Sequence, residues 1–231
     1  MIYNGKDLRD FHVDFMDESA FLVVPKPSVT TASVVGRNGD LRYSNKRYEN
    51  LSIDCKSLIL GDFRRYYGEL AAFLTQDQSY HKLEGFRDPD TYRMAAVESI
   101  GEPTLGNFAR RGIFTITFNC KPFRYLRTGD DSIIYTGSGK VYSECIVPAK
   151  PLLRVYGYGT IVVGTGTLAI ASGAGTYTDI DCDRKDAYRG ADNLNKYLTV
   201  TKWPELEYGN NAITLPSTVT KLELTPRWVT L

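Results

Sequence analysis

The spacing of apolar side chains predicts one helix in the first half of the chain. Just after Gly61, apolar residues recur every three or four positions, and Asp62 stands before them as an N-cap. These residues are Phe63, Tyr66, Tyr67, Leu70, Ala71 and Leu74. The pattern predicts a helix over about residues 62–76. Residues 51–60 and 111–123 instead alternate between apolar and polar positions, which is typical of strands with one buried face.

The second half of the chain has the pattern of an all-β domain. From residue 151 onward, short apolar runs are separated by turn residues at intervals near ten, which indicates a β-sandwich or barrel. Residues 128–143 are rich in Gly, Ser and Thr and are predicted to form a linker or an edge hairpin. We therefore expect a mostly β chain with an α+β domain over residues 1–128 and a β-sandwich over residues 129–231.

A hairpin is predicted before the helix. Asn38-Gly39 stands between two strand-like flanks, and this dipeptide favours a tight turn because both central residues take positive φ. We expect a projecting two-stranded arm over about residues 33–45.

Charge and composition exclude several classes of partner. Lys and Arg total 28 against 27 Asp and Glu, so a net charge of +1 gives no reason to expect a nucleic-acid or membrane-surface partner. The N-terminal residues lack the pattern of a signal peptide, and no stretch approaches the roughly 20 apolar residues of a membrane span. We expect a protein that is made and folded in a cytoplasm.

The chain lacks the motifs of a metal site or a common hydrolase. Its four cysteines form no C-x-x-C pair and only two histidines accompany them, so buried free thiols are expected. No nucleophile-elbow or zinc-protease motif is present. We predict no enzymatic activity, no cofactor and no metal site.

Two segments imitate known binding motifs. Residues 164–169 (GTGTLA) have the spacing of a dinucleotide-binding turn, but a strand-like run follows where that turn needs a helix, so a β-hairpin is predicted. Residues 179–184 (DIDCDR) imitate a calcium loop but lack its glycine and its final acid. The aspartates of this segment are therefore expected on the solvent face of a strand, with Ile180 and Cys182 facing inward.

Eight fragments, taken in order along the chain, carry a family resemblance. They read IYNGKDL, VVGRNGDL, LAAFLTQDQSYHKLEGFRDPDTYRMA, FTITFNCKPFRY, PLLRVYGYGTIVV, IDCDRKDAYRG, WPELEYGNNAI and KLELTPRWVTL. The most specific parts are CKPFRY at 120–125 and TPRW at 225–228. Together they resemble, nearly end to end, the distal tail protein (Dit) family of bacteriophages with long, non-contractile tails.

The resemblance implies a structural role in the virion. Dit proteins form a homo-hexameric ring that joins the tail tube to tail-associated, receptor-binding or baseplate proteins, and DNA passes through the lumen without sequence recognition. Such a protein is assembled in the cytoplasm of the host bacterium and resides at the phage tail tip. The resemblance also implies a galectin-like second domain and a belt arm that clasps the neighbouring subunit. The arm residues it indicates are Val35, Arg37, Asn38, Gly39, Leu41 and Tyr43.

Two other functions stay open at the level of sequence. A galectin-like carbohydrate-binding protein would use Asn193 and Trp203, with Tyr197 and Tyr208 nearby as stacking surfaces, although aromatic side chains in a sandwich usually belong to the core. A small hydrolase of cell-wall glycans would need a pair of carboxylates that no spacing singles out.

Overall fold

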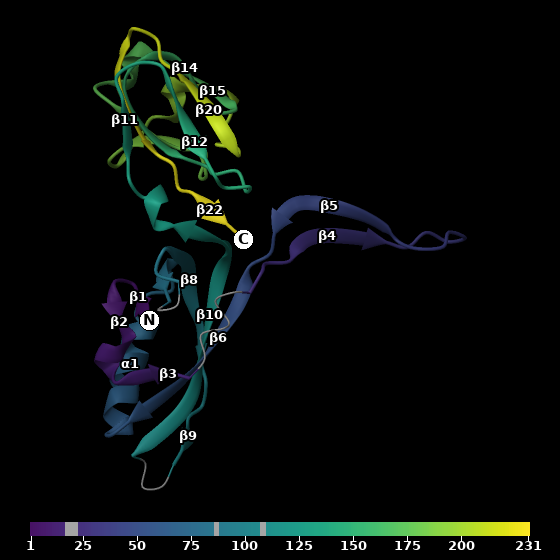
Figure 1. Ribbon diagram of the computed structural model, residues 1–231, viewed down its shortest axis with the longest axis vertical. Helices are drawn as coiled ribbons and strands as arrows, with labels where there is room; N and C mark the ends of the chain where they lie inside the picture. The colour runs from purple at the N-terminus through teal and green to yellow at the C-terminus, as the bar shows by residue number, and fades with distance from the viewer. Residues whose placement is uncertain (17–22, 86–87, 107–109) are drawn as a thin grey trace. The chain divides into compact units, whose positions relative to one another are not determined.

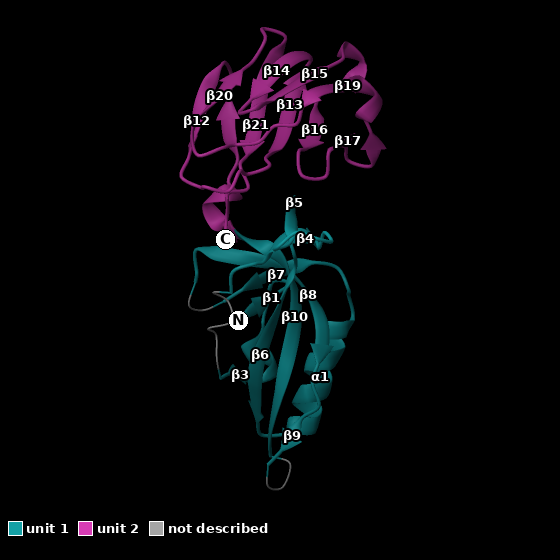
Figure 2. Cartoon of the chain, turned by 90° about the vertical axis from the view of Figure 1, so that its right-hand side faces the viewer, with its two compact units in different colours: residues 1–124, 231 teal, residues 125–230 magenta. Residues whose placement is uncertain are grey.

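The chain divides into two compact units. The computed structural model describes residues 1–16, 23–85, 88–106 and 110–231. Unit 1 comprises residues 1–124 and residue 231, and unit 2 comprises residues 125–230 (Figure 2). This division lies four residues before the expected boundary between residues 128 and 129.

Unit 1 is built on a sheet with the strand order β2-β1-β7-β8-β10-β6-β3 (Figure 1). The strands are β1 Ile2–Tyr3, β2 Lys6–Asp7, β3 Val13–Phe15, β6 Leu51–Leu60, β7 His81–Glu84, β8 Thr91–Ile100, β9 Thr104–Leu105, which pairs with β10, and β10 Arg111–Leu126. The register of β6 and β10 places Phe118 opposite Ile53 and Ile116 opposite Cys55, and all four are buried. The alternation in the sequence thus produces the inner face of this sheet.

The predicted helix is confirmed as α1, Phe63–Thr75. The Asp62 side chain accepts a hydrogen bond from the backbone N–H of Arg65 at 3.4 Å and caps the first turn. Phe63, Leu70 and Leu74 are buried in the core of unit 1, where Phe114 of the sheet also lies. A short 3-10 helix, η1 Leu8–Phe11, lies against α1.

Unit 2 consists of two antiparallel sheets that pack their apolar faces together. One sheet contains β11 Ile133–Tyr135, β13 Leu152–Gly157, β16 Thr178–Asp181, β17 Asp186–Arg189, β18 Asp192–Asn193 and β21 Val219–Thr225. The other contains β12 Gly139–Ser143, β14 Gly159–Val163, β15 Gly166–Ile170, β19 Leu198–Lys202 and β20 Gly209–Thr214. The remaining elements are β22 Val229–Thr230 and three 3-10 turns, η4 Arg127–Gly129, η5 Ser172–Ala174 and η6 Asn195–Tyr197.

The prediction of a mostly β chain with one α-helix is confirmed for the described residues. The likeness of unit 2 to galectins stays a prediction. Residues 128–143 are neither the expected linker nor an edge hairpin, because β11 pairs with β21 in one sheet and β12 pairs with β20 in the other. The three residues between β11 and β12 therefore carry the chain from one layer to the other.

The glycine motif at 164–169 is a hairpin, as predicted. β14 and β15 pair across a two-residue turn in which Gly164 has a φ of +54°. A Cβ on Gly166 would lie 2.2 Å from the backbone nitrogen of Pro204. The two glycines thus serve a turn and a close backbone approach rather than a phosphate.

The prediction that the aspartates of residues 179–184 face solvent is wrong for the first two. Asp179 and Asp181 are 6% and 2% exposed. The guanidinium of Arg154 donates to Asp179 at 2.6 and 3.0 Å, and that of Arg227 donates to Asp181 at 3.0 and 3.1 Å. Bidentate pairing with arginine offsets the cost of removing these carboxylates from water, which an alternation rule does not take into account.

All four cysteines are buried free thiols, as predicted. Burial raises the pKa of both Cys120 and Cys182 to about 12. Among the helices that the structure describes, none has the length and apolar character needed to cross a membrane.

Candidate subunit-binding arm

The arm is a two-stranded sheet of its own that extends from unit 1 (Figure 1). It is formed by β4 Pro27–Ala32 and β5 Leu41–Tyr48, whose register places Thr30 opposite Tyr43 and Ala32 opposite Leu41. The amide of Asn45 donates to the hydroxyls of Ser28 and Thr30 at 3.0 and 3.3 Å. Nearly every residue of the two strands is exposed or half-buried, so hydrogen bonds rather than a core hold the arm together.

The arm exists, but its strands and its turn are not where the sequence predicts them. Strands β4 and β5 flank an eight-residue loop over residues 33–40. The backbone N–H of Arg37 bonds to the carbonyl of Val34 at 3.1 Å, and Gly36 between them has a φ of +82°. Gly39 also has a positive φ but Asn38 does not, so a tight Asn-Gly turn is excluded. The chain instead turns earlier in the loop, where Gly36 supplies the residue with positive φ that the turn from Val34 to Arg37 requires.

The predicted arm residues lie at the free end of the hairpin. Val35 is fully exposed, and Arg37, Asn38 and Gly39 are exposed beside it in the loop. In β5, Tyr43 is 58% exposed and shares one face with the half-buried Leu41, because residues two apart in a strand point the same way. Exposed apolar and aromatic side chains on an isolated hairpin are typical of an interaction surface.

A buried arginine in unit 1 holds the chain segment that enters the arm. Arg93 of β8 is 1% exposed. Its guanidinium donates to the carbonyl of Pro122 at 3.1 Å and to the carbonyl of Val23, four residues before β4, at 2.9 Å. Burial lowers the pKa of Arg93, yet a guanidinium stays charged in proteins. Arg93 therefore ties two strands of the sheet to the root of the arm.

The second leg of the arm is held by ring packing and a backbone hydrogen bond. Tyr48, the last residue of β5, contacts Phe123 of β10 edge to face, with ring centroids 5.5 Å apart. The N–H of Glu49 donates to the carbonyl of Lys26 at 2.9 Å and closes the base of the hairpin. The root is thus fixed to unit 1 and the tip is free.

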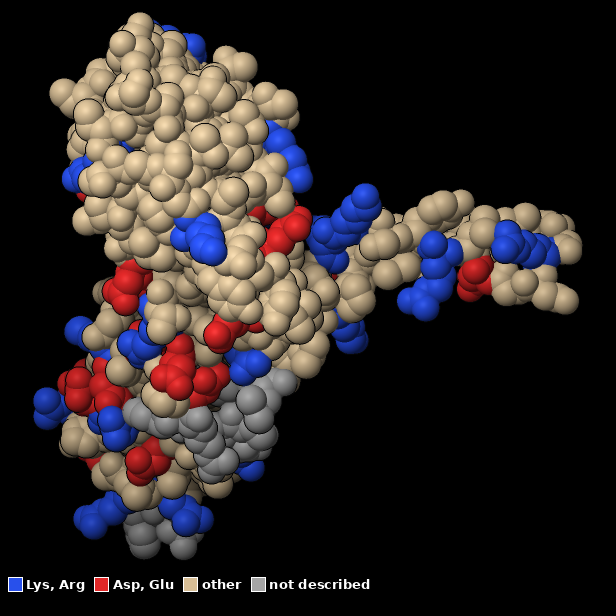
Figure 3. Space-filling view, turned by 45° about the horizontal axis from the view of Figure 1, so that its top comes forward, with Lys and Arg blue, Asp and Glu red and all other residues tan. Residues whose placement is uncertain are grey.

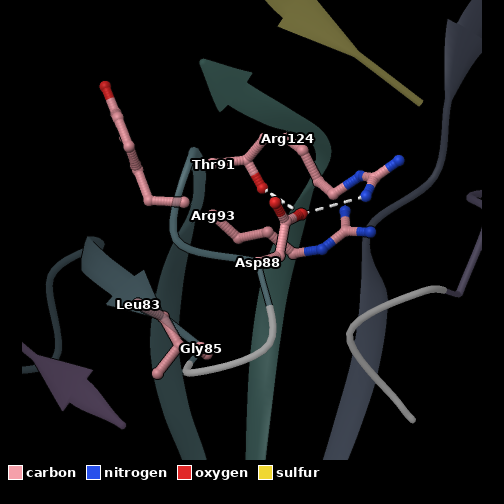
Figure 4. A pocket seen from close by; sticks show the side chains of 7 residues that line it. Leu83, Gly85, Asp88, Thr91, Arg93 and Arg124 are labelled. Carbon is pink, nitrogen blue, oxygen red and sulfur yellow. Dashed lines mark hydrogen bonds and ion pairs between the residues drawn. The ribbon is translucent and has the colours of Figure 1, made fainter. Parts of the chain in front are cut away.

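A small pocket beside the root contains a second arginine (Figure 4). Asp88 accepts hydrogen bonds from Thr91 at 2.5 Å and from Arg124 at 3.1 Å. Arg124 also donates to the carbonyl oxygen of Leu231. Arg93 lines the same pocket from below these groups. Asp88 thus joins Thr91 to Arg124, and Arg93 bonds to backbone carbonyls, which gives the pocket the character of a structural network.

The predicted sugar-contact residues of unit 2 are not joined. Asn193 is exposed on β18 of one sheet, and Trp203 is half-buried just after β19 of the other. Among the described residues, no hydrogen bond or ring contact links them. The exposed aromatic pair is instead Tyr142 of β12 and Tyr208, which are 53% and 64% exposed with ring centroids 6.4 Å apart. Sequence reasoning missed Tyr142. Its neighbours in β12, Val141 and Ser143, are buried, and the alternation of a strand therefore places Tyr142 on the solvent face.

Within the described ranges, no three His, Cys, Asp or Glu side chains come together as a group that could hold a metal ion. The buried carboxylates of unit 2, Asp179 and Asp181, are paired with Arg154 and Arg227, an arrangement that supports packing. The arm is the surface that the geometry singles out.

No family model and no curated protein sequence matches this chain, but solved structures do. The crystal structure of the SPP1 Dit protein, described as a paradigm of the hub adsorption apparatus in phages that infect Gram-positive bacteria, matches 100% of this chain and 98% of its own with a TM-score of 0.74 and 16% identity. Two structures of the phage P2 baseplate in its activated conformation, with Ca and with Sr, match 95% of this chain and 91% of theirs, with TM-scores of 0.50 and identities of 12% and 11%. The resemblance to Dit proteins is therefore confirmed at the level of the fold.

Proposed function

We propose that this protein is a structural component of a bacteriophage tail tip. Six copies form a ring that joins the distal end of the tail tube to tail-associated and receptor-binding or baseplate proteins, and DNA passes through its lumen during ejection. The protein is assembled in the bacterial cytoplasm and ends in the virion. The observation that carries this proposal is the match of the whole chain to a Dit hub protein.

Two features of this chain support the proposal. A ring with cyclic symmetry needs two different surfaces on each copy, one that reaches out and one that receives, and the free arm supplies the first. The near-neutral net charge of +1 suits a channel for DNA, because a strongly basic lumen would retain the phosphates.

The direct test is the molar mass of the full-length protein by light scattering over a concentration series, followed by negative-stain imaging. A mass of about 155 kDa, six times 25.9 kDa, together with annular particles would support the ring. A monomer at every concentration, also after mixing with tail tube protein, would contradict it.

The role of the arm is tested separately by shortening it without disturbing its root. Thr30 and Tyr43 are direct partners across the hairpin, so residues 31–42 are replaced by Asn-Gly, which closes a two-residue turn between them. We expect the variant to fold with the stability of the wild type and to lose the ring. A ring of unchanged stability would refute the belt assignment and leave the tail-tip proposal standing.

Carbohydrate binding by unit 2 is the second candidate. The exposed pair Tyr142 and Tyr208 favours it, since tyrosine rings held open to solvent offer a stacking face to a pyranose. A glycan array probed with the full chain tests this candidate, with Tyr142→Ala as the binding-site variant and Trp203→Ala as the variant of the site expected from sequence. An array without hits would remove it.

A further inference from the structure

The arm carries a charge opposite to that of the rest of the chain. Residues 27–48 contain four basic residues, Arg37, Arg42, Lys46 and Arg47, and one acid, Asp40, which gives +4 − 1 = +3. The whole chain has a net charge of +1, so the remainder carries +1 − 3 = −2. Figure 3 shows this contrast as blue side chains along the arm with little red among them.

These basic side chains are available to a partner. All four are exposed. Within the described part of the chain, none of them forms an ion pair with a carboxylate of its own copy, whereas some exposed basic residues elsewhere, such as Lys150 and Arg65, do. Arg37 stands in the loop two residues from the exposed Val35, and the other three stand on β5, where Arg42 is next to Tyr43.

We infer that the arm docks on an acidic surface of a second copy of this chain, with Arg42, Lys46 and Arg47 meeting carboxylates of that copy. The inference rests on the proposed ring and names the chemistry of its receiving surface. Two arms repel each other because each carries +3, so charge disfavours a symmetric contact between arms. Charge instead favours arm against body, which is the head-to-tail arrangement that closes a ring.

Salt is the first measurable consequence. The Debye length falls from about 14 Å at about 0.05 M salt to about 4 Å at about 0.5 M, so exposed ion pairs are screened over this range. We expect the protein concentration at half-assembly to rise by about tenfold or more across it. An assembly held by the apolar residues of the arm alone would be unchanged or strengthened by salt.

The decisive test is zero-length cross-linking of the wild-type protein at low salt. A carbodiimide joins a lysine amine to a carboxylate only when the two are in contact. Full-length protein with and without nitrogen-15 is mixed, cross-linked and digested, so that mixed-isotope peptides report links between copies. We expect Lys46 to be linked to an Asp or Glu outside the arm of another copy. Assembled protein in which Lys46 has no such link would overturn the inference.

Charge reversal with a matched control completes the test. Arg42→Glu with Arg47→Glu changes two exposed strand residues of the arm, and Lys140→Glu with Lys202→Glu changes two exposed strand residues of unit 2 by the same total charge. We expect only the arm variant to lose assembly, with both variants as stable as the wild type by urea unfolding.

The remaining outcomes are distinct. If the arm variant forms irregular aggregates while its rings persist, its charges serve only to keep open strand edges from pairing, and the inference is wrong. If rings form and respond to neither salt nor charge reversal, the inference fails and the proposed ring stands. A wild-type chain that is monomeric under all conditions would overturn both.

Discussion

Replacing Arg93 with Met tests whether a buried cation fixes the root of the arm. Methionine fills much of the volume of the arginine stem but donates no hydrogen bond. The carbonyls of Val23 and Pro122, which accept from Arg93 at 2.9 and 3.1 Å, would then lose this donor. A hydrogen bond from a charged donor contributes about 1.5–3 kcal/mol, and less at Val23, which is 43% exposed; the loss is partly offset because the guanidinium no longer has to be removed from water. We expect the free energy of unfolding of unit 1 to fall by about 1–3 kcal/mol.

The local effect distinguishes this role from general packing. Because Val23 leads into β4, amide hydrogen exchange should rise at residues 23–29 more than in β6 or β10. Arg124→Met, in the same pocket, is the control, since Arg124 bonds to Asp88 and Leu231 rather than to the arm. Arg93→Lys keeps the charge and should restore part of the stability. Unchanged exchange at residues 23–29 in Arg93→Met, with unfolding like that of the wild type, would refute the reasoning.

Three further predictions concern single side chains. Asp181→Asn should destabilise unit 2 by about 2–4 kcal/mol in urea unfolding at neutral pH, because Arg227 loses a bidentate carboxylate. Burial raises the pKa of Asp181, but hydrogen bonds from Arg227 and the backbone lower it more, so the folded pKa lies below the unfolded value. The stability that the Asp181 carboxylate contributes is therefore fully present above the unfolded pKa of about 4 and is lost as pH falls through the lower folded pKa. The Asn variant should lack this acid step, and an identical pH profile would contradict the pairing. Gly166→Ala should lower the thermal midpoint, since its Cβ would lie 2.2 Å from Pro204 N, and an unchanged midpoint would refute that close approach. Cys120, whose pKa burial raises to about 12, should resist thiol reagents in the folded protein and react after unfolding, and rapid labelling of native protein would show that it is accessible.

The parts of the fold that were predictable depend on contacts between near neighbours in sequence. The apolar spacing around Leu70 and Leu74 and the cap at Asp62 identify α1, because both act within a few turns of one helix. The Gly164 hairpin follows in the same way from the absence of a helix pattern after its turn.

The parts that were missed depend on partners far away in the chain. The burial of Asp179 and Asp181 requires Arg154 and Arg227, which are 25 and 46 residues distant, and no periodicity of the segment itself reveals them. The position of Arg93 does carry a sequence signal, since it stands among apolar residues of β8, where a buried charge needs a specific partner. The sequence favoured a turn at Asn38-Gly39, whereas the structure has it at Gly36. Both sites contain a glycine that can take a positive φ, and only the packing of the whole loop selects between them.

The exposure of the arm has a consequence for how its sequence can change. Because β4 and β5 bury almost nothing within their own copy, we expect most substitutions there to leave the folding of the chain unaffected. If the arm is the docking element that we propose, the residues that determine folding and those that determine the partner lie in separate segments of the chain. On the proposed ring, a library of arm variants on an otherwise constant chain is a practical route to assemblies that accept only a chosen neighbour.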